Sequence, residues 1–216
     1  TKLSDYHFVC SEQSRNRVID MCVDPKSVFN YGCPSMDILV NEDLSINAEL
    51  EESIIGVGTK TNFKKPYFLM LQHPVTTSYK KGFSQVEETL NALLKVKDMQ
   101  KIVMWPNVDA GSKDVAKGIR KFREYKADET FYFVKNLSPE NYARLLNNSF
   151  CCIGNSSSFI RECSFLGIPA IIVGDRQIGR EHGNNVKFSN YDRNEIYEKL
   201  KVYKEKTRFK KETIFG

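Results

Sequence analysis

Residues 154–162, GNSSSFIRE, combine small polar side chains with one carboxylate, and this pattern could bind a phosphate. They follow an apolar run, so they stand where a strand should end and a helix should begin. A helix N-terminus presents unpaired backbone N–H groups and a partial positive charge, and serine hydroxyls add donors. One serine would be read as a simple helix cap. A glycine with three serines after a strand favours a phosphate site.

Glu162 lies about one turn into the same predicted helix. A carboxylate only accepts hydrogen bonds, so beside a phosphate it should face a ligand group that carries hydroxyl donors. The ribose of a nucleotide meets this requirement. A solvated helix glutamate is the alternative, and the residues alone leave the two open.

Other polar side chains follow neighbouring apolar runs. The Gly-rich segment 174–186 contains two arginines, and an arginine offers a rigid fork of donors suited to phosphate. A lone histidine is more often structural, but His73 follows a predicted strand and should share its sheet edge with the serines. The residues that follow strands are His73, Asn107, Asp109, Arg176 and Gln177.

Short apolar runs that alternate with amphipathic stretches must position these groups. Such a pattern is typical of a parallel sheet covered on both faces, so we expect a doubly wound, Rossmann-like α/β domain over about 64–190. Ligands of such sheets bind beyond the carboxyl ends of the strands. The predicted strands are 6–10, 27–32, 67–72, 101–105, 130–134, 150–154 and 169–174. The predicted helices are 12–22, 34–40, 83–96, 112–125, 138–148, 158–167 and 192–206. Residues 41–53 should be a polar surface segment and 54–66 a linker.

The composition excludes several classes of protein. Of 216 residues, 41% are hydrophobic and 27% charged, which suits a globular protein with a real core. No apolar run approaches the ~20 residues of a membrane span, and no signal peptide is visible, so we expect a cytoplasmic protein without membrane contact. The six cysteines form no CxxC pair and the three histidines lack metal-ligand spacing, so neither a disulfide framework nor a metal site is expected. The net charge of +5 comes with no known nucleic-acid motif, and no nucleic-acid partner is expected.

Several segments together resemble the UDP-N-acetylglucosamine 2-epimerase family. The resemblance runs in order over nearly the whole chain. It implies a glycosyltransferase-B-like fold of two Rossmann-like domains with the active site between them, of which this chain would supply the C-terminal half. The segments are HFVCSEQSRNRVI (7–19), YGCPSMDIL (31–39), QHPVTT (72–77), WPNVDAGS (105–112), GNSSSFIRE (154–162), GIPAIIVGDRQIGRE (167–181) and HGNNV (182–186).

The resemblance also implies a reaction. Family members remove the proton at C2 of UDP-N-acetylglucosamine and eliminate UDP, which leaves a glycal; hydrolysing members then add water and release N-acetylmannosamine. Non-hydrolysing members typically carry His-Arg-Arg-Glu-Asn where this chain has HPVTT (73–77), so the chain resembles the hydrolysing type, which begins the synthesis of sialic acid and related nonulosonic acids. No cofactor is implied. Because members are usually oligomers, we expect a homo-oligomer for the full-length parent.

Residue by residue, the resemblance implies that Ser156 and Ser157 hold the diphosphate and that Glu162 binds the ribose hydroxyls. His73 and Arg176 would lie on the diphosphate side of the cleft, with His73 as the catalytic candidate. Residues 138–142 would shelve the uracil, although Pro139 stands where an aromatic residue is common. The implied UDP-binding residues are Asn155, Ser156, Ser157, Ser158, Glu162 and Arg176.

The family's first domain carries the carboxylates proposed for proton transfer, and it would precede residue 1. We therefore expect a fragment, inactive on its own. Residues 1–63 would be the end of the first domain with the hinge, 64–190 the UDP-binding domain, and 191–216 a C-terminal helix with a truncated tail. Two alternatives stay open: a sister hydrolysing epimerase of a UDP-2,4-diacetamido sugar on the legionaminic acid route, and a catalytically inactive UDP-binding module.

Overall fold

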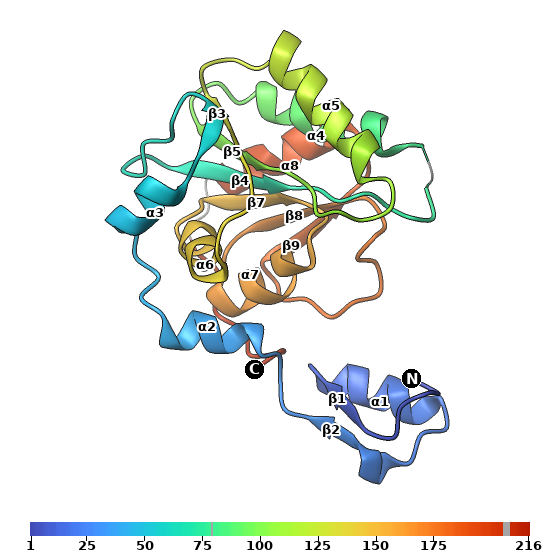
Figure 1. The fold of residues 1–216 in the computed structure, drawn as a ribbon. Coiled ribbons are helices and arrows are strands. Elements are labelled where there is room, and N and C mark those ends of the chain that lie inside the picture. Colours follow the sequence, from blue (N-terminus) through green and yellow to red (C-terminus); the bar gives the residue numbers. More distant parts are fainter. Residues whose placement is uncertain (79, 205–207) are drawn as a thin grey trace.

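The structure, a computed structural model, describes residues 1–78, 80–204 and 208–216. A seven-stranded sheet forms its centre, in the order β3-β6-β5-β4-β7-β8-β9 (Figure 1). Every neighbouring pair is parallel except β3 with β6. The predicted doubly wound α/β fold is confirmed. The strands are β3 (Gly56–Gly58), β4 (Tyr67–Leu71), β5 (Gln100–Met104), β6 (Phe131–Val134), β7 (Cys151–Gly154), β8 (Ala170–Val173) and β9 (Val186–Ser189).

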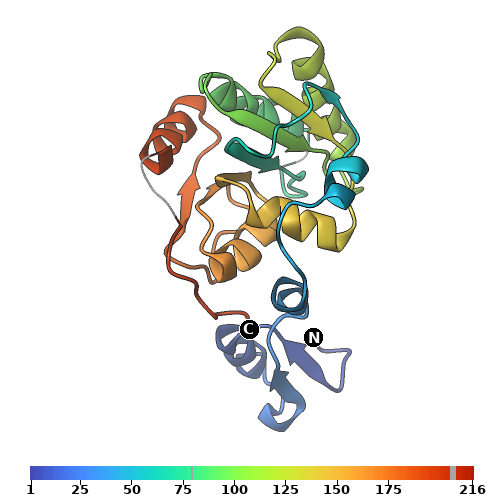
Figure 2. The same cartoon turned by 90° about the vertical axis from the view of Figure 1, so that its left-hand side faces the viewer.

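Helices cover both faces of this sheet (Figures 1 and 2). Successive side chains of β4 point to opposite faces, as in any strand. Phe68 and Met70 pack into one core cluster, and Tyr67, Leu69 and Leu71 into the other. The first cluster receives α4 (Gly82–Leu94), α5 (Ser112–Tyr125) and α8 (Arg193–Lys204); the second receives α2 (Ser35–Asn41), α3 (Ala48–Ser53), α6 (Pro139–Asn147) and α7 (Arg161–Leu166).

Several elements differ from the sequence prediction, including α3, which lies within the predicted polar surface segment 41–53. Strand β9 lies just beyond the predicted Gly-rich loop, at the edge of the sheet, where two of its four residues are only half-buried. Strand β3 lies within the predicted linker and contains two glycines, so it gave no apolar run. The predicted helix 158–167 is split into a 3-10 turn, η2 (Ser157–Phe159), and the short helix α7.

The N-terminal residues form a separate small unit below the main body, near α2 and the C-terminus (Figures 1 and 2). Strands β1 (His7–Val9) and β2 (Val28–Asn30) pair in parallel and α1 (Glu12–Asp20) connects them. The unit contacts the segment after β8, because Arg17 Nη2 donates to the Gly179 carbonyl oxygen at 2.7 Å and the Ser11 hydroxyl donates to the Glu181 carboxylate.

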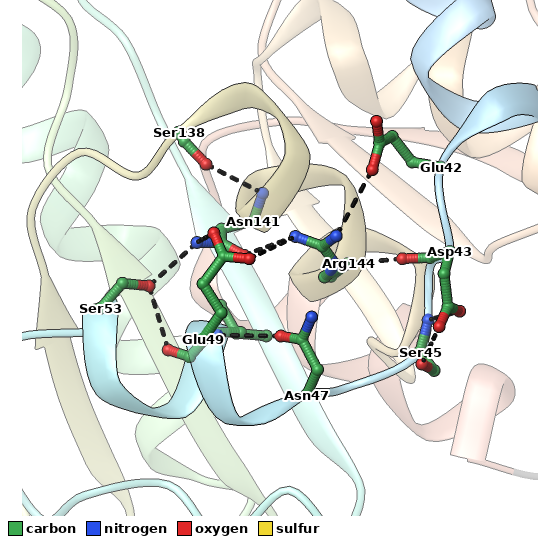
Figure 3. Close-up of polar contacts among 10 residues, drawn as sticks. Glu42, Asp43, Ser45, Asn47, Glu49, Ser53, Ser138, Asn141 and Arg144 are labelled. Carbon is green, nitrogen blue, oxygen red and sulfur yellow. Dashed lines mark hydrogen bonds and ion pairs between the residues drawn. The ribbon is translucent and has the colours of Figure 1, made fainter.

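Residues 41–53, expected to be a polar surface segment, are held on α6 by Arg144 (Figure 3). The Arg144 side chain is 8% exposed, and its guanidinium lies 3.4 Å from the Glu42 carboxylate and 3.7 Å from that of Glu49. It also donates to the Asp43 carbonyl oxygen at 3.0 Å and to Asn141 Oδ1 at 2.9 Å. One buried cation therefore ties the connection between α2 and α3 to the helix that borders the candidate site.

Replacing Arg144 should destabilise the fold measurably. Arg144→Met keeps most of the apolar stem but leaves the buried Asn141 Oδ1 without this donor and removes the contacts to Glu42, Asp43 and Glu49, so the free energy of unfolding should fall by about 1–3 kcal/mol in a urea titration. Arg123→Met is the control, since Arg123 pairs only with the half-exposed Glu124, and it should cost about 0.5 kcal/mol or less. Equal losses in both variants would contradict the role given to Arg144.

Candidate functional site

The order in which the chain adds strands reverses at β4: β5 and β6 lie on one side of it, and β7 and β8 on the other. In parallel sheets such a reversal opens a crevice, here between the carboxyl ends of β4 and β7. The structure brings His73 and Asn155 together there, and Asn155 is fully buried. The His73 backbone N–H donates to Asn155 Oδ1 at 2.6 Å, and Asn155 Nδ2 donates to the His73 carbonyl oxygen at 2.9 Å. The predicted histidine and the predicted serine loop thus share one edge.

The segment after β8 reaches the same place. Arg176 Nη1 donates to the Asn155 carbonyl oxygen at 3.1 Å, and Gln177 Nε2 donates to the same oxygen at 2.8 Å. Gln177 is fully buried, whereas Arg176 is exposed and lines a cavity. Arg176 therefore lies beside the serine loop, as a phosphate-binding arginine must.

The His73 ring is 4% exposed, and its Nδ1 accepts a hydrogen bond from the Asn107 backbone N–H at 3.3 Å. Burial of the ring, together with the nearby positive charge of Arg176, lowers the pKa of His73 to about 4, although the Asp109 carboxylate opposes the shift. The ring is therefore neutral at pH 7. Because Nδ1 is an acceptor, the single proton lies on Nε2, which makes His73 a hydrogen-bond donor rather than a base.

The serine loop has two kinds of serine. Ser156 Oγ accepts from the Ser158 backbone N–H at 3.4 Å and lies 2.9 Å from the Ser158 hydroxyl, which lies 2.6 Å from the Tyr142 hydroxyl. Ser158 is thus engaged within the protein, whereas Ser157 is half-exposed. Because only a 3-10 turn and a six-residue helix follow, anion binding here depends on nearby donors more than on a long helix dipole.

Glu162 is 8% exposed, and one of its oxygens pairs with Arg161 Nη2 at 3.4 Å. Its other oxygen, Oε2, is buried and has no hydrogen-bond partner among the described residues. A buried carboxylate oxygen without a donor is costly. The position therefore suits a ligand that brings hydroxyl groups.

Cavities lie along this edge. A cavity of about 340 Å³ is lined by residues that include His73, Trp105, Tyr142 and Ser156. A second of about 500 Å³ is lined by Thr76, Thr77, Asp109 and Arg176, and a third of about 800 Å³ opens between α1 and the segment after β8. Sequence reasoning did not select Trp105 or Tyr142, although Tyr142 ends the segment 138–142 that it did consider.

The described part of the chain contains neither a metal-binding cluster nor a membrane span. No group of three or more histidine, cysteine, aspartate or glutamate side chains there could hold a metal ion. No helix in that part is long and apolar enough to span a membrane.

Comparison with known proteins gives consistent matches. The family model described as UDP-N-acetylglucosamine 2-epimerase matches residues 1–216. "Polysialic acid biosynthesis protein P7" of Escherichia coli is 32% identical over 188 residues, which cover 86% of this chain and 46% of that protein. "GDP/UDP-N,N'-diacetylbacillosamine 2-epimerase (hydrolyzing)" of Campylobacter jejuni is 28% identical over 201 residues, 93% of this chain and 51% of that protein. The chain spans about half the length of the curated relatives it matches.

Solved structures agree on the fold. The UDP-GlcNAc 2-epimerase from Neisseria meningitidis bound to UDP-GlcNAc has a TM-score of 0.74 at 16% identity, over 99% of this chain and 58% of that one. The enzyme from Methanocaldococcus jannaschii in complex with UDP-GlcNAc and UDP has a TM-score of 0.75 at 15% identity, over 100% and 58%. With a family model that matches every residue, the chain belongs to the UDP-N-acetylglucosamine 2-epimerase family.

Proposed function

We propose that this chain is the nucleotide-binding half of a hydrolysing UDP-N-acetylglucosamine 2-epimerase. One observation supports the proposal: Arg176 contacts the serine loop at the Asn155 carbonyl oxygen, and Glu162, in the short helix that follows this loop, keeps a buried oxygen without a donor. An anion alone would be repelled by Glu162, and a neutral sugar alone would bring no negative charge to Arg176. A nucleoside diphosphate satisfies both, because it joins a charged diphosphate to a ribose with two hydroxyl groups.

The cavities support an assignment of the ligand's parts. The cavity of about 340 Å³, which contains Trp105 and Tyr142, suits a planar base. The cavity of about 500 Å³ borders Arg176 and Thr76, on the side where a sugar attached to the diphosphate would extend. Asn155 and Ser158 belong to the same binding loop, although both side chains bond within the protein.

In the proposed reaction, a base removes the proton at C2 while the bond between C1 and the UDP oxygen breaks, and the electrons of the C–H bond form the C1=C2 double bond of a glycal. Negative charge develops on the leaving diphosphate. Neutral His73 would donate its Nε2–H to that diphosphate, and Arg176 would add a positive charge. Water then adds to the glycal. The base would come from the other half of the full-length protein, which fits a division into residues 1–63, 64–190 and 191–216.

A second candidate function rests on the relatives. Two matched proteins are named as hydrolysing N,N'-diacetylbacillosamine 2-epimerases, from Campylobacter jejuni and Legionella pneumophila. A UDP-2,4-diacetamido sugar differs from UDP-N-acetylglucosamine only in the sugar, so both substrates would use the same nucleotide half. Assaying the full-length parent with each substrate distinguishes these two functions from each other and from an inactive UDP-binding module.

The 216-residue chain should bind UDP without turning over UDP-N-acetylglucosamine. Calorimetric titration of UDP measures binding, and release of N-acetylmannosamine from the same sample measures activity. Absence of UDP binding would contradict the nucleotide site. Turnover would show that the proton-transfer groups lie within this chain.

Glu162→Ala should weaken UDP binding by about 1–3 kcal/mol, or roughly 5- to 150-fold in Kd, because the ribose hydroxyls lose their acceptor. The assignment to the ribose can be tested with 2′,3′-dideoxyuridine diphosphate, which lacks both hydroxyls. Wild type should lose affinity for this analogue, and Glu162→Ala should bind both ligands equally. Glu124→Ala removes an exposed glutamate on α5 and should match wild type. An undiminished preference for UDP in Glu162→Ala would rule out the ribose contact.

His73 should govern both turnover and acid stability. His73→Gln in the full-length parent should lower turnover more than UDP affinity.

The pKa of His73 is about 4 in the folded chain against 6.5 for the free side chain. The unfolded state therefore binds more protons between these values, and the free energy of unfolding falls as pH drops from 6.5 towards 4. His73→Gln should remove up to about 3 kcal/mol of that loss, as measured by urea titrations across this range. An unchanged slope in His73→Gln would contradict the buried neutral ring.

A further inference from the structure

We propose that Asn155 is a positioning residue that holds His73 and the Arg176–Gln177 segment in one fixed arrangement. Its side chain acts through His73 and does not need to touch the nucleotide. This inference rests on the proposed function for its catalytic consequence, but the geometry that supports it is independent of any ligand.

Strand β7 ends at Gly154, where its backbone lies unusually close to β4. Gly154 has a φ of +139°, and a Cβ there would lie 2.1 Å from the Leu71 carbonyl oxygen. Only glycine fits such a close approach. The Asn155 backbone N–H still donates to that same oxygen of Leu71, at 3.2 Å, but the backbone then departs from β4.

Beyond that point the hydrogen bonds between the two strands are continued by the Asn155 side chain, which bonds to the backbone of His73. Its amide oxygen accepts from the His73 N–H at 2.6 Å, and its amide nitrogen donates to the His73 carbonyl oxygen at 2.9 Å. The side-chain amide of Asn155 thus pairs with both the backbone N–H and the backbone carbonyl of His73. Aspartate would place a second acceptor against the His73 carbonyl oxygen, so an asparagine is required here.

Further support comes from the Asn155 carbonyl oxygen, which accepts from Arg176 Nη1 at 3.1 Å and from Gln177 Nε2 at 2.8 Å. Asn155 and Gln177 are both fully buried, so the bond between them is shielded from water, whereas the bond from the exposed Arg176 is partly buried. The His73 ring is in turn held by the Asn107 backbone N–H. One residue therefore fixes the distance between the proposed donor and the proposed phosphate-binding cation.

This arrangement matters because both groups would act on the same developing charge. Preorganised donors are effective only when they stay within about 0.5 Å of the productive geometry. We therefore expect loss of Asn155 to affect catalysis through displacement of His73, with a larger effect on kcat than on KM.

Asn155→Ala in the 216-residue chain tests the inference, with NMR of the His73 ring and thermal unfolding as readouts. The control is Asn185→Ala, because Asn185 is equally buried and donates to the Ile168 carbonyl oxygen at 2.6 Å, away from the crevice. Both variants should lower the melting temperature. Only Asn155→Ala should displace the His73 ring resonances and raise the His73 pKa from about 4 towards 6.5. Unchanged His73 resonances, or an equal change in Asn185→Ala, would overturn the proposal.

A second variant, Gln177→Met, keeps the inference testable should Asn155→Ala fail to fold. It removes one bond to the Asn155 carbonyl oxygen and keeps a side chain of similar length. It should displace Arg176 and so weaken UDP binding about fivefold. An affinity within twofold of wild type would show that the bond between Gln177 and the Asn155 carbonyl oxygen does not position Arg176, which would overturn this part of the proposal. If wild type itself fails to bind UDP, the proposed function fails while the His73 readout still decides the role of Asn155.

Discussion

The pairing of β4 with β7 is the constraint on which the site depends. These strands are far apart in the sequence, yet Leu71 lies opposite Gly154, and all residues of both strands are buried. The chain reverses the direction in which it adds strands at this pair, so the helices that follow β4 and β7 lie on opposite faces and leave the crevice between them. Burial of both strands fixes their register, since a shift of one residue would turn every side chain to the wrong face.

That register places polar groups just beyond the strand ends, where His73, Asn155 and Glu162 are buried but border the crevice side of the sheet. The site nevertheless holds groups in states that water would not favour. His73 is kept neutral by burial, and Glu162 retains an oxygen without a donor. In the proposed complex, the nucleotide diphosphate and ribose meet these groups when they bind. A ligand that cannot form hydrogen bonds with these groups would leave them unpaired and would therefore bind more weakly, which adds to the selectivity of the site.

Sequence reasoning found the parts of the fold that have strong local patterns. Strands β4 to β8 are short apolar runs bounded by turns, and α6 begins where Ser138 and Pro139 predict it. It missed β3 and β9, since edge strands that are half-buried or rich in glycine carry little pattern. Among the predicted site residues, His73, Ser156 and Arg176 were selected from their places after strands, and Glu162 from its place in the helix that follows the serines. The amide bonds of Asn155, the burial of Gln177 and the hydroxyl contact between Tyr142 and Ser158 depend on tertiary packing, which no local pattern reveals.

The central claim is that the serine loop and Glu162 together bind one nucleotide. A crystal structure of the chain with UDP tests it most directly. We predict that the diphosphate lies within hydrogen-bonding distance of Ser156, Ser157 and Arg176, with a ribose hydroxyl on the Oε2 of Glu162 that is unpaired in the free chain. UDP bound in the cavity between α1 and the segment after β8, or a ribose that leaves this oxygen unpaired, would contradict the claim.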